Sequence, residues 1–545
     1  MSAALKGCHR RRGVVLVLAM IFIVVFSALA MALAASSGAN VQIASNQHKV
    51  NNALHAAQSG LECAKYLVGT VTLPRTNVNL VTTAQANTVW SNLVSYAQTT
   101  RLDNKTVPGA QRFTDSGGSG DELITPQMDF GSPAVAFSIR FYRYDSDPRT
   151  IKMQSVGTNE SVTRRVAMDM DVTKDREVLE YAIAGRGRMW LTGDTTIHGN
   201  LFSTWDVARI SPFNTTSDTT VEGTISTVRT LDEIDADTYQ LETLDTNDLP
   251  LDVNGAPLGQ NYADRYYGPS DEIQGYHEGI NYGQPYNDMP GLDISDYNTD
   301  LYKPGLTAIP ACPTAQQVTE YFPHAAGNYS LPRPGGATSF VRHVYENQTF
   351  SNAILPANRH ALFRNCTFQD VLYVDSSKTS TSKSYTNNVR FENCVFNGVL
   401  VTNVPQSFNW VNNCLYFTGA AAFNNQSSIP EATILAPHFN VNLGNTNPAQ
   451  NDNNVLTGAI VGGIVDVRGN AQIYGTIISM CDTSRWTSGY VTNIGATLND
   501  GGSETVELGD VGVISITPDE DTMLPSGITS PIIIKPDQTT YSETI

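Results

Sequence analysis

The first pattern along the chain is an apolar run close to its N-terminus. Residues 13–35 carry no charged side chain. A helix of that length would reach about 35 Å, which is enough to cross a hydrocarbon core of ~30 Å. The run is longer than the apolar region of a signal peptide, but alanine-rich stretches at 28–30 and 32–35 leave a cleavable signal peptide as an alternative. The pattern favours a membrane-spanning helix.

The helical pattern continues beyond the apolar run. No proline interrupts residues 36–69, and apolar residues recur there at steps of three and four: Val50, Leu54, Ala57, Leu61, Ala64 and Val68. This spacing places them on one face of an amphipathic helix. A signal peptide has no reason to continue into such a helix. We therefore expect a single helix over 14–68, apolar in its first half and amphipathic in its second.

The next pattern is an alternation of apolar and polar residues. Phe137, Ile139 and Phe141 alternate with polar neighbours, which is the period of a half-buried strand. Residues 151–172 predict two further strands around a turn at 157–159. We expect a small antiparallel sheet that packs against the polar end of the helix.

Two internal repeats dominate the rest of the chain. YENQTF (345–350), FRNCTF (363–368), FENCVF (391–396) and WVNNCLYF (410–417) share one template, and GDTTIHGNLFS (193–203) resembles GNAQIYGTIIS (469–479). Short β-rich units that recur at roughly 20 residues are typical of a right-handed parallel β-helix. Its rungs would stack equivalent residues, with aromatic and cysteine side chains inside and asparagines at the corners. The expected ladder is Asn347, Asn365, Cys366, Asn393, Cys394, Asn413 and Cys414.

These patterns predict a mainly β protein with five segments. They are a basic leader at 1–13, the long N-terminal transmembrane helix at 14–68, a small antiparallel subdomain at 69–180, a right-handed parallel β-helix at 181–482 and a β-rich segment at 483–545. A loop insertion at about 228–335 is rich in Tyr, Gly, Pro, Asp and Asn. Such a loop suits contact with surface carbohydrate or protein, or it only seals one face of the β-helix.

Charge separates the N-terminus from the body. The chain has a formal net charge of −18, yet residues 1–61 contain no Asp or Glu. The acidic charge of the body argues against nucleic acid as a partner, because phosphate binding needs clustered Lys and Arg. Arg10, Arg11 and Arg12 precede the apolar run and would keep that end in the cytoplasm by the positive-inside rule. The body would then lie outside the cytoplasm.

The chemistry-bearing residues do not assemble into a recognisable catalytic motif. The seven cysteines include no C-x-x-C pair and the nine histidines show no ligand spacing, so we expect no metal and no cofactor. Residues 298–300 (NTD) match one motif of polygalacturonase-like hydrolases, but the accompanying acid pair, His-Gly and Arg-x-Lys motifs are absent. We expect a protein that is not an enzyme, with an anchored polysaccharide hydrolase or lyase as an alternative.

The N-terminal region resembles a known family. A short basic leader that ends in Arg12 and Gly13, an apolar helix that starts at Val14, and the continuation ALHAAQSGLECA (53–64) resemble PilX-type minor pilins and the general secretion pathway K pseudopilins. The resemblance implies that a prepilin peptidase cuts after Gly13. Val14 would become the N-methylated first residue, and the helix would pack against other pilin-like subunits.

One residue departs from the pattern of most pilins. Major pilins carry a glutamate at the fifth mature position, where this chain has Leu18. A carboxylate in an apolar environment needs a cationic partner, and the N-terminal amine of a neighbouring subunit can supply it. Leu18 has no charge with which to pair with that amine. This departure favours a place at the filament tip.

The resulting hypothesis is a minor, tip-type subunit of a type IV pilus or pseudopilus. It would be a single-pass protein of the bacterial inner membrane whose periplasmic or extracellular body serves assembly or cell adhesion. A surface adhesin that uses a pilin-like anchor outside any filament is the alternative.

Overall fold

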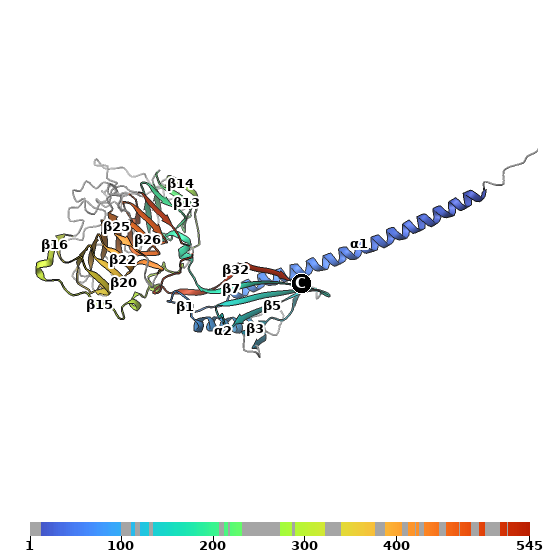
Figure 1. The fold of residues 1–545 in the computed structure, drawn as a ribbon, viewed down its shortest axis with the longest axis horizontal. Coiled ribbons are helices and arrows are strands. Elements are labelled where there is room, and N and C mark those ends of the chain that lie inside the picture. The colour runs from blue at the N-terminus through green and yellow to red at the C-terminus, as the bar shows by residue number, and fades with distance from the viewer. Residues whose placement is uncertain are drawn as a thin grey trace, which may run out of the picture. The chain divides into compact units, whose positions relative to one another are not determined.

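The structure is a computed structural model, and it describes residues 12–99, 111–114, 120–129, 134–205, 212–215, 218–230, 273–285, 289–321, 339–376, 387–405, 413–419, 421–424, 430–445, 454–467, 469–480, 490–495, 513–519 and 521–544. The chain divides into two compact units (Figure 1). The helix–sheet unit comprises residues 1–74, 82–173 and 533–545. The strand unit comprises residues 75–81 and 174–532.

The helix–sheet unit contains the expected long helix and a sheet. Its helices are α1 (Arg12–Gly69) and α2 (Thr83–Thr99). Its strands are β2 (Gln111–Thr114), β3 (Gly120–Ile124), β4 (Met128–Asp129), β5 (Val135–Tyr144), β6 (Thr150–Asn159) and β7 (Val162–Lys174), with β32 (Ser530–Thr544) joining from the C-terminus. The short β1 (Arg75–Thr76) belongs to the strand unit and pairs with Ser530 and Pro531 at the start of β32. The helix confirms the prediction for residues 14–68.

The sheet of this unit is antiparallel across its central strands. Its described strands follow the order β1, β32, β7, β6, β5, β3 and β2, with β4 paired to β5. The β6–β7 turn lies at Glu160 and Ser161 rather than at 157–159, because Thr158 pairs with Thr163 and Asn159 with Val162. Glu160 takes the positive φ of 53° that the tight turn requires. The predicted turn at 157–159 is therefore wrong by a few residues, since the strand continues through Gly157.

The strand unit is built from short strands. They are β8 (Tyr181–Gly185), β9 (Arg188–Leu191), β10 (Thr195–Ile197), β11 (Asn200–Ser203), β12 (Phe213–Thr215), β13 (Thr220–Thr227), β14 (Tyr276–Asn281), β15 (Thr307–Ala308), β16 (Gln317–Tyr321), β17 (Ser339–Glu346), β18 (Thr349–Leu355), β19 (Ala361–Arg364), β20 (Thr367–Val374), β21 (Asn388–Glu392), β22 (Val395–Thr402), β23 (Cys414–Thr418), β24 (Ala422–Phe423), β25 (Ala432–Asn445), β26 (Asn454–Thr457), β27 (Ala459–Val467), β28 (Ala471–Tyr474), β29 (Ile477–Ser479), β30 (Tyr490–Ile494) and β31 (Ile514–Thr517). Among the described residues they are accompanied by the 3₁₀ helices η1 (Glu177–Glu180), η4 (Ile294–Asp296), η5 (Thr299–Tyr302) and η6 (Thr314–Gln316).

Strands of this unit pair in parallel with the strand next but one along the chain. β17, β19, β21 and β23 form one such series, and β18, β20 and β22 form another. The register stacks aromatic side chains into two columns. One column is Tyr345, Phe363, Phe391 and Phe417, and the other is Phe350, Phe368, Phe396 and Phe423. Ring centroids within a column lie 4.7–5.6 Å apart.

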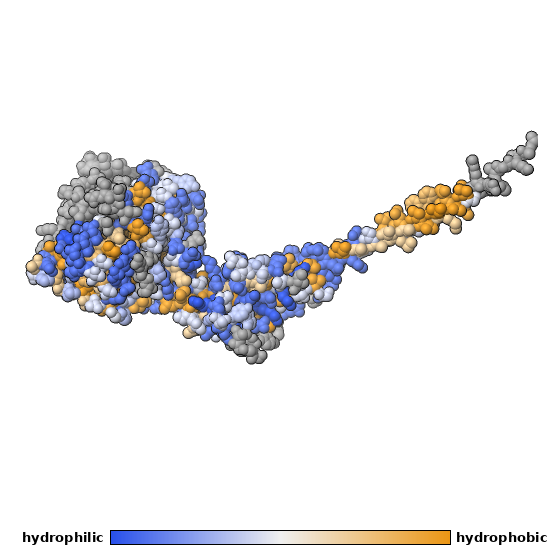
Figure 2. Space-filling view, in the orientation of Figure 1, coloured by the Kyte–Doolittle hydropathy of each residue, from blue (hydrophilic) through white to orange (hydrophobic). Residues whose placement is uncertain are grey.

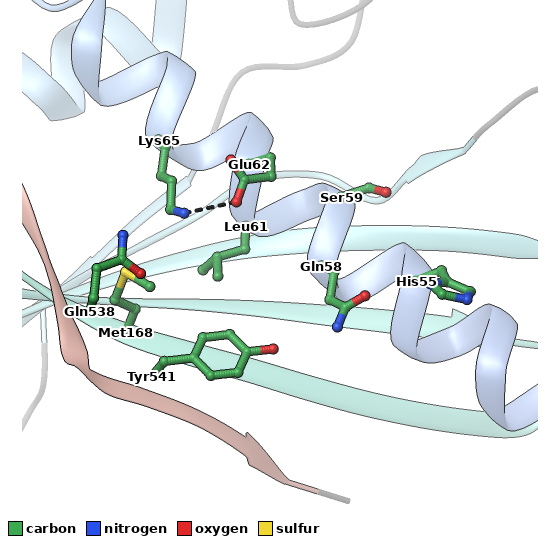
Figure 3. A pocket seen from close by; sticks show the side chains of 9 residues that line it. All are labelled: His55, Gln58, Ser59, Leu61, Glu62, Lys65, Met168, Gln538 and Tyr541. Carbon is green, nitrogen blue, oxygen red and sulfur yellow. Dashed lines mark hydrogen bonds and ion pairs between the residues drawn. The ribbon is translucent and has the colours of Figure 1, made fainter. Parts of the chain in front are cut away.

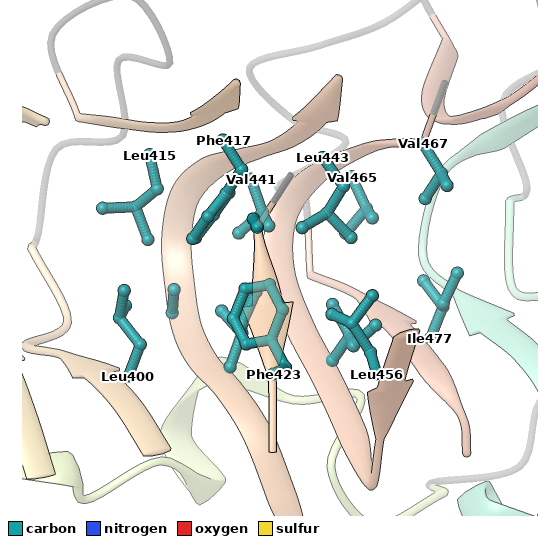
Figure 4. Close-up of a cluster of buried hydrophobic side chains, with 14 of the residues drawn as sticks. Leu400, Leu415, Phe417, Phe423, Val441, Leu443, Leu456, Val465, Val467 and Ile477 are labelled. Atoms are coloured by element: carbon teal, nitrogen blue, oxygen red, sulfur yellow. The ribbon is translucent and has the colours of Figure 1, made fainter. Parts of the chain in front are cut away.

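These columns belong to a continuous apolar core. Figure 4 shows Leu415, Phe417, Val441 and Leu443 in one row and Leu400, Phe423 and Leu456 in a facing row. Strand segments this short cannot bury an apolar face alone, so each turn of chain depends on its neighbours for burial. The stacking of equivalent positions supplies that burial.

The order of strands in space differs from their order along the chain. The similar copies at 193–203 and 469–479 lie close together, because β10 and β28 both pair with β31. β8 likewise pairs with β29, and β9 with β30. The first strands of the unit therefore lie beside its last strands.

The C-terminal segment does not form a part of its own. Within the expected β-rich segment at 483–545, β30 and β31 belong to the strand unit and most of β32 belongs to the helix–sheet unit. Both units are thus built from residues that are remote in sequence.

The described part of the 228–335 insertion covers an outer face of the strand unit. Met289, Leu292, Tyr297 and Tyr302 are buried and pack in one cluster with strand residues such as Val401. Tyr297 donates a hydrogen bond to the carbonyl oxygen of Gly291 at 2.7 Å. This part of the insertion seals a face, while residues 231–272 lie outside the described residues.

Candidate functional site

The N-terminal half of α1 is apolar and exposed. Its most apolar 18-residue window has a mean hydropathy of 3.1 and is not buried at all. Figure 2 shows this half as a continuous hydrophobic surface. Apolar side chains surround the helix, which is the pattern of a helix embedded in a membrane or among other apolar helices. The helix is long and apolar enough to span a membrane.

The residues at which the family resemblance implies leader cleavage lie at the start of this helix. Arg10 and Arg11 lie outside the described residues, and Arg12 begins α1. Gly13 and Val14 are exposed, and no atom lies within 4 Å of where a Gly13 side chain would begin. Leu18 is 51% exposed on the same apolar surface.

The second half of α1 packs on the sheet. Ala57, Leu61, Ala64 and Val68 are buried, as the helical spacing predicts. Val50 and Leu54 are only partly buried. The surroundings of the helix therefore change along its length: its first half is exposed and apolar, and its second half is packed on the sheet.

Two glycines permit this packing. A side-chain carbon at Gly157 of β6 would overlap the carbonyl oxygen of Ala53 and the backbone nitrogen of Ala57. A carbon at Gly60 would overlap Ser155 and Phe137. The sequence-based reasoning missed both residues as packing determinants. The available signal was a glycine inside an otherwise alternating strand, which often marks a close backbone approach.

An ion pair joins the helix to the β6–β7 turn. Lys49 Nζ lies 2.6 Å from a carboxylate oxygen of Glu160. Both side chains are substantially exposed, so this pair contributes little to stability. Lys49 lies just before the part of the helix that is buried.

The expected ladder residues are placed in two different ways. Asn347, Asn365 and Asn393 take positive φ angles of 54°, 49° and 52°, so their repeated position is a left-handed corner of the chain. Asparagine and glycine tolerate that conformation better than other residues. Cys366 and Cys394 follow two of these corners and are fully buried.

The fourth copy of the template is shifted. Phe417 pairs with Phe391, and Cys414 pairs with Asn388, so Asn413 and Cys414 do not occupy the ladder position. Gly419, two residues after Phe417, has a φ of 69° and occupies the position that corresponds to Asn393. The assignment of Asn413 and Cys414 to this ladder is wrong, because glycine replaces asparagine at the left-handed corner.

The cysteines that the structure describes are free thiols: Cys63, Cys312, Cys366, Cys394 and Cys414. Cys312 Sγ lies 3.3 Å from His343 Nδ1. Burial, with the Arg359 charge as a smaller cause, lowers the pKa of His343. The imidazole is therefore neutral at pH 7 and can accept a hydrogen bond from the thiol.

The motif at residues 298–300 is part of the packing. Tyr373 donates a hydrogen bond to Asp300 Oδ1 at 3.0 Å, and Lys303 Nζ lies 3.3 Å from the same atom. The described residues contain no group of three or more His, Cys, Asp or Glu that could hold a metal ion.

Comparison with known proteins identifies the N-terminal segment. Residues 12–62 match the PilX N-terminal family model. No curated protein matches the chain significantly. Among solved structures, the chain is similar to the competence-associated pilin ComZ from Thermus thermophilus, with 12% sequence identity and a TM-score of 0.29. That comparison covers 91% of this chain and 97% of the other. The N-terminal segment is thus pilin-like.

Proposed function

We propose that the protein is a minor pilin-like subunit of a type IV pilus or pseudopilus. The observation that carries the proposal is the division of α1: its first half is exposed and apolar, and its second half is packed on an antiparallel sheet. The match of residues 12–62 to the PilX N-terminal family supports it. Other pilin-like subunits would pack laterally against the exposed half.

The same proposal includes processing at the membrane. A prepilin peptidase cleaves after Gly13, and Val14 becomes the methylated N-terminus. Arginines 10–12 hold the leader in the cytoplasm by the positive-inside rule, so the body lies in the periplasm or outside the cell. The helix waits in the inner membrane until assembly.

The position in the filament follows from Leu18. A subunit within the filament body needs a polar group in its apolar helix that can pair with the amine of its neighbour. Leu18 offers none. We assign the subunit to the tip, where the large strand unit also has room.

We further propose that the strand unit is a right-handed parallel β-helix that serves assembly or adhesion rather than catalysis. Its parallel pairing of strands next but one and its stacked aromatic columns support that architecture. The tie of Asp300 to Tyr373 and Lys303 gives this carboxylate a structural role, which supports binding over hydrolysis. Surface carbohydrate or protein would be the ligand.

The test is the mass of the mature chain. The protein is produced in cells that contain a prepilin peptidase, extracted in detergent, and measured by intact-mass and N-terminal peptide analysis. We expect a chain that starts at N-methylated Val14. Gly13→Leu should retain the leader, whereas Gly38→Leu, at an equally open helix position, should be processed normally. A mature chain that begins near Ala35 would show that the segment is a signal peptide and overturn the proposal.

A second measurement separates a filament subunit from an adhesin that uses only the anchor. Cysteines introduced at exposed positions of the apolar half, such as Val24 and Met31, should cross-link to other pilin-like subunits in isolated filaments. Exclusive recovery of the processed protein in the membrane, without such cross-links, would favour the free adhesin.

A further inference from the structure

One outer face of the strand unit carries two rows of outward-pointing side chains. It is formed by six parallel strands in the order β26, β28, β31, β10, β13 and β14, of which β13 and β14 lie side by side in Figure 1. Leu456, Ile473 and Ile516 on these strands belong to the apolar core, so the residues that alternate with them point outward. At a spacing of about 4.8 Å between strands, the face is about 24 Å wide.

The first row is uncharged and polar along most of its length. Its members, in the order of the strands, are Val455, Gln472, Ser515, Thr196, Thr220 and Tyr276. The hydroxyl groups of Ser515, Thr196 and Thr220 make no hydrogen bond within the part of the chain that the structure describes. A hydroxyl can both donate and accept hydrogen bonds, so this row offers a ligand several free polar groups.

Two exposed tyrosines lie near opposite ends of the face. Tyr474 on β28 is 45% exposed, and Tyr276 on β14 is 57% exposed. The strands between them present polar side chains, so the face lacks the apolar centre of a typical protein–protein interface. A sugar ring combines an apolar face of C–H groups with a rim of hydroxyls, and it can therefore stack on tyrosine and bind the hydroxyl row. These features favour a polysaccharide over a protein as the ligand.

The second row carries the charge of the face. It comprises Thr457, Tyr474, Thr517, His198, Glu222 and Glu278. A carboxylate oxygen of Glu222 lies 2.6 Å from Nδ1 of His198, whereas Glu278 has no ion-pair partner among the described residues. None of the six strands contains Lys or Arg. The resulting negative potential repels anionic polysaccharides and attracts protonated amino groups.

We propose that this face binds a linear polysaccharide that carries free amino groups. The polysaccharide lies across the strands, with sugar rings stacked on Tyr474 and Tyr276. The hydroxyls between the two tyrosines bind the rims of the sugar rings, and the carboxylates of Glu222 and Glu278 bind the protonated amines. This choice of ligand rests on the binding function proposed for the strand unit. The mass of the mature chain tests the pilin assignment, so that assignment and the ligand can fail separately.

The experiment uses the full chain in detergent and a hexamer of β-1,4-linked glucosamine that is labelled with fluorescein at its reducing end. Fluorescence anisotropy measures binding at slightly acidic pH, where the amines are protonated and the carboxylates are ionised. We expect saturable binding. Tyr474→Ala should weaken binding about fivefold, because it removes a stacking surface. The double variant Glu222→Gln and Glu278→Gln should also weaken it about fivefold, but should not change the affinity for the N-acetylated hexamer, which carries no charge.

Matched variants show whether these effects belong to the face. Tyr66→Ala removes a tyrosine that is 72% exposed on α1, and it should leave the affinity unchanged. The double variant Glu346→Gln and Glu392→Gln removes two carboxylates from β17 and β21 of the same unit, and it should also bind as the wild type does. A hexamer of galacturonic acid should not bind, because the face repels its carboxylates. Circular dichroism of each variant checks that the strands are intact.

Several outcomes would overturn the proposal. These are the absence of binding at about 1 mM hexamer, an unchanged affinity of Tyr474→Ala, and equal losses of affinity in the two glutamate double variants. Equally tight binding of a lysine octapeptide would show that the face recognises charge and not sugar. Tighter binding of the N-acetylated hexamer would reject the amino-sugar ligand but retain a binding function for the strand unit.

Discussion

Lys174 is a buried cation at the start of the strand unit. Its side chain is 3% exposed, and its Nζ donates hydrogen bonds to the carbonyl oxygens of Leu524 at 3.3 Å and Pro525 at 3.1 Å. Burial lowers the pKa of Lys174 to about 7, and the charges of Glu431 and Asp296 offset only part of that shift. A lysine whose pKa is lowered by folding favours the folded state most when it is neutral.

The lowered pKa of Lys174 predicts that the free energy of unfolding of the strand unit increases from pH 7 to pH 9. Between the folded pKa of about 7 and the unfolded value of 10.5, the unfolded chain binds more protons, so the free energy of unfolding rises with pH. The expected gain is about 2 kcal/mol. Urea unfolding followed by tryptophan fluorescence at both pH values measures it.

Lys174→Met is the matched control for this prediction. Methionine keeps the apolar part of the side chain and does not titrate, so the variant should gain about 2 kcal/mol less than the wild type over the same pH interval. An identical pH dependence in the two proteins would assign the effect to other groups.

The left-handed corners show what a residue pattern can predict. The repeated asparagines pointed to a recurring structural unit, and the structure stacks the aromatic residues beside them in register. The template aligned the fourth copy (410–417) in the wrong register, because it required an asparagine and not a residue with positive φ at the corner. Gly419 and Asn393 both take positive φ, and a template that treats asparagine and glycine as equivalent would have chosen the correct register.

At the scale of elements, α1 was predictable because its signal is long and periodic. The small antiparallel sheet was also predictable in its central strands, since alternation over β5 to β7 is clear. The close approach of α1 to β6 was not, because a single glycine in a strand has several interpretations. It required the observation that Ala53 and Ala57 lie directly over Gly157.

Gly157→Ala should therefore weaken the contact between α1 and β6. The added methyl group would overlap the backbone of α1, and relieving that overlap should cost about 1–3 kcal/mol. Pulse proteolysis in urea, with the cleaved peptides mapped to the helix–sheet unit, measures the change. Gly69→Ala is the control, because no atom lies within 4 Å of its new methyl group and its effect should stay within about 0.5 kcal/mol. Equal stabilities of the two variants would contradict the close-packing argument.

At the scale of the whole molecule, the chain order and the spatial order differ. The strand unit begins beside its own last strands, and the C-terminus returns to the sheet that packs on the N-terminal helix. Periodicity within the sequence cannot reveal such a return, because it reports which residues share a face and not which distant strands are neighbours. The division of residues 483–545 between the two units is therefore not visible in the sequence pattern.

The return of the C-terminus predicts that a truncation at one end of the chain will damage the unit that contains the other end. Removal of residues 533–545 deletes most of β32, exposes the edge of β7, and uncovers the side of Met168 next to Tyr541 (Figure 3). Hydrogen exchange should become at least about tenfold faster in β7, because its amides lose the cover of a neighbouring strand. The strands β27 and β28 should exchange as before, because their partners lie within the strand unit. Removal of residues 542–545 alone should change little, because the side chains of 542–544 are exposed. Unchanged protection of β7 in the longer truncation would mean that β32 adds nothing to the sheet.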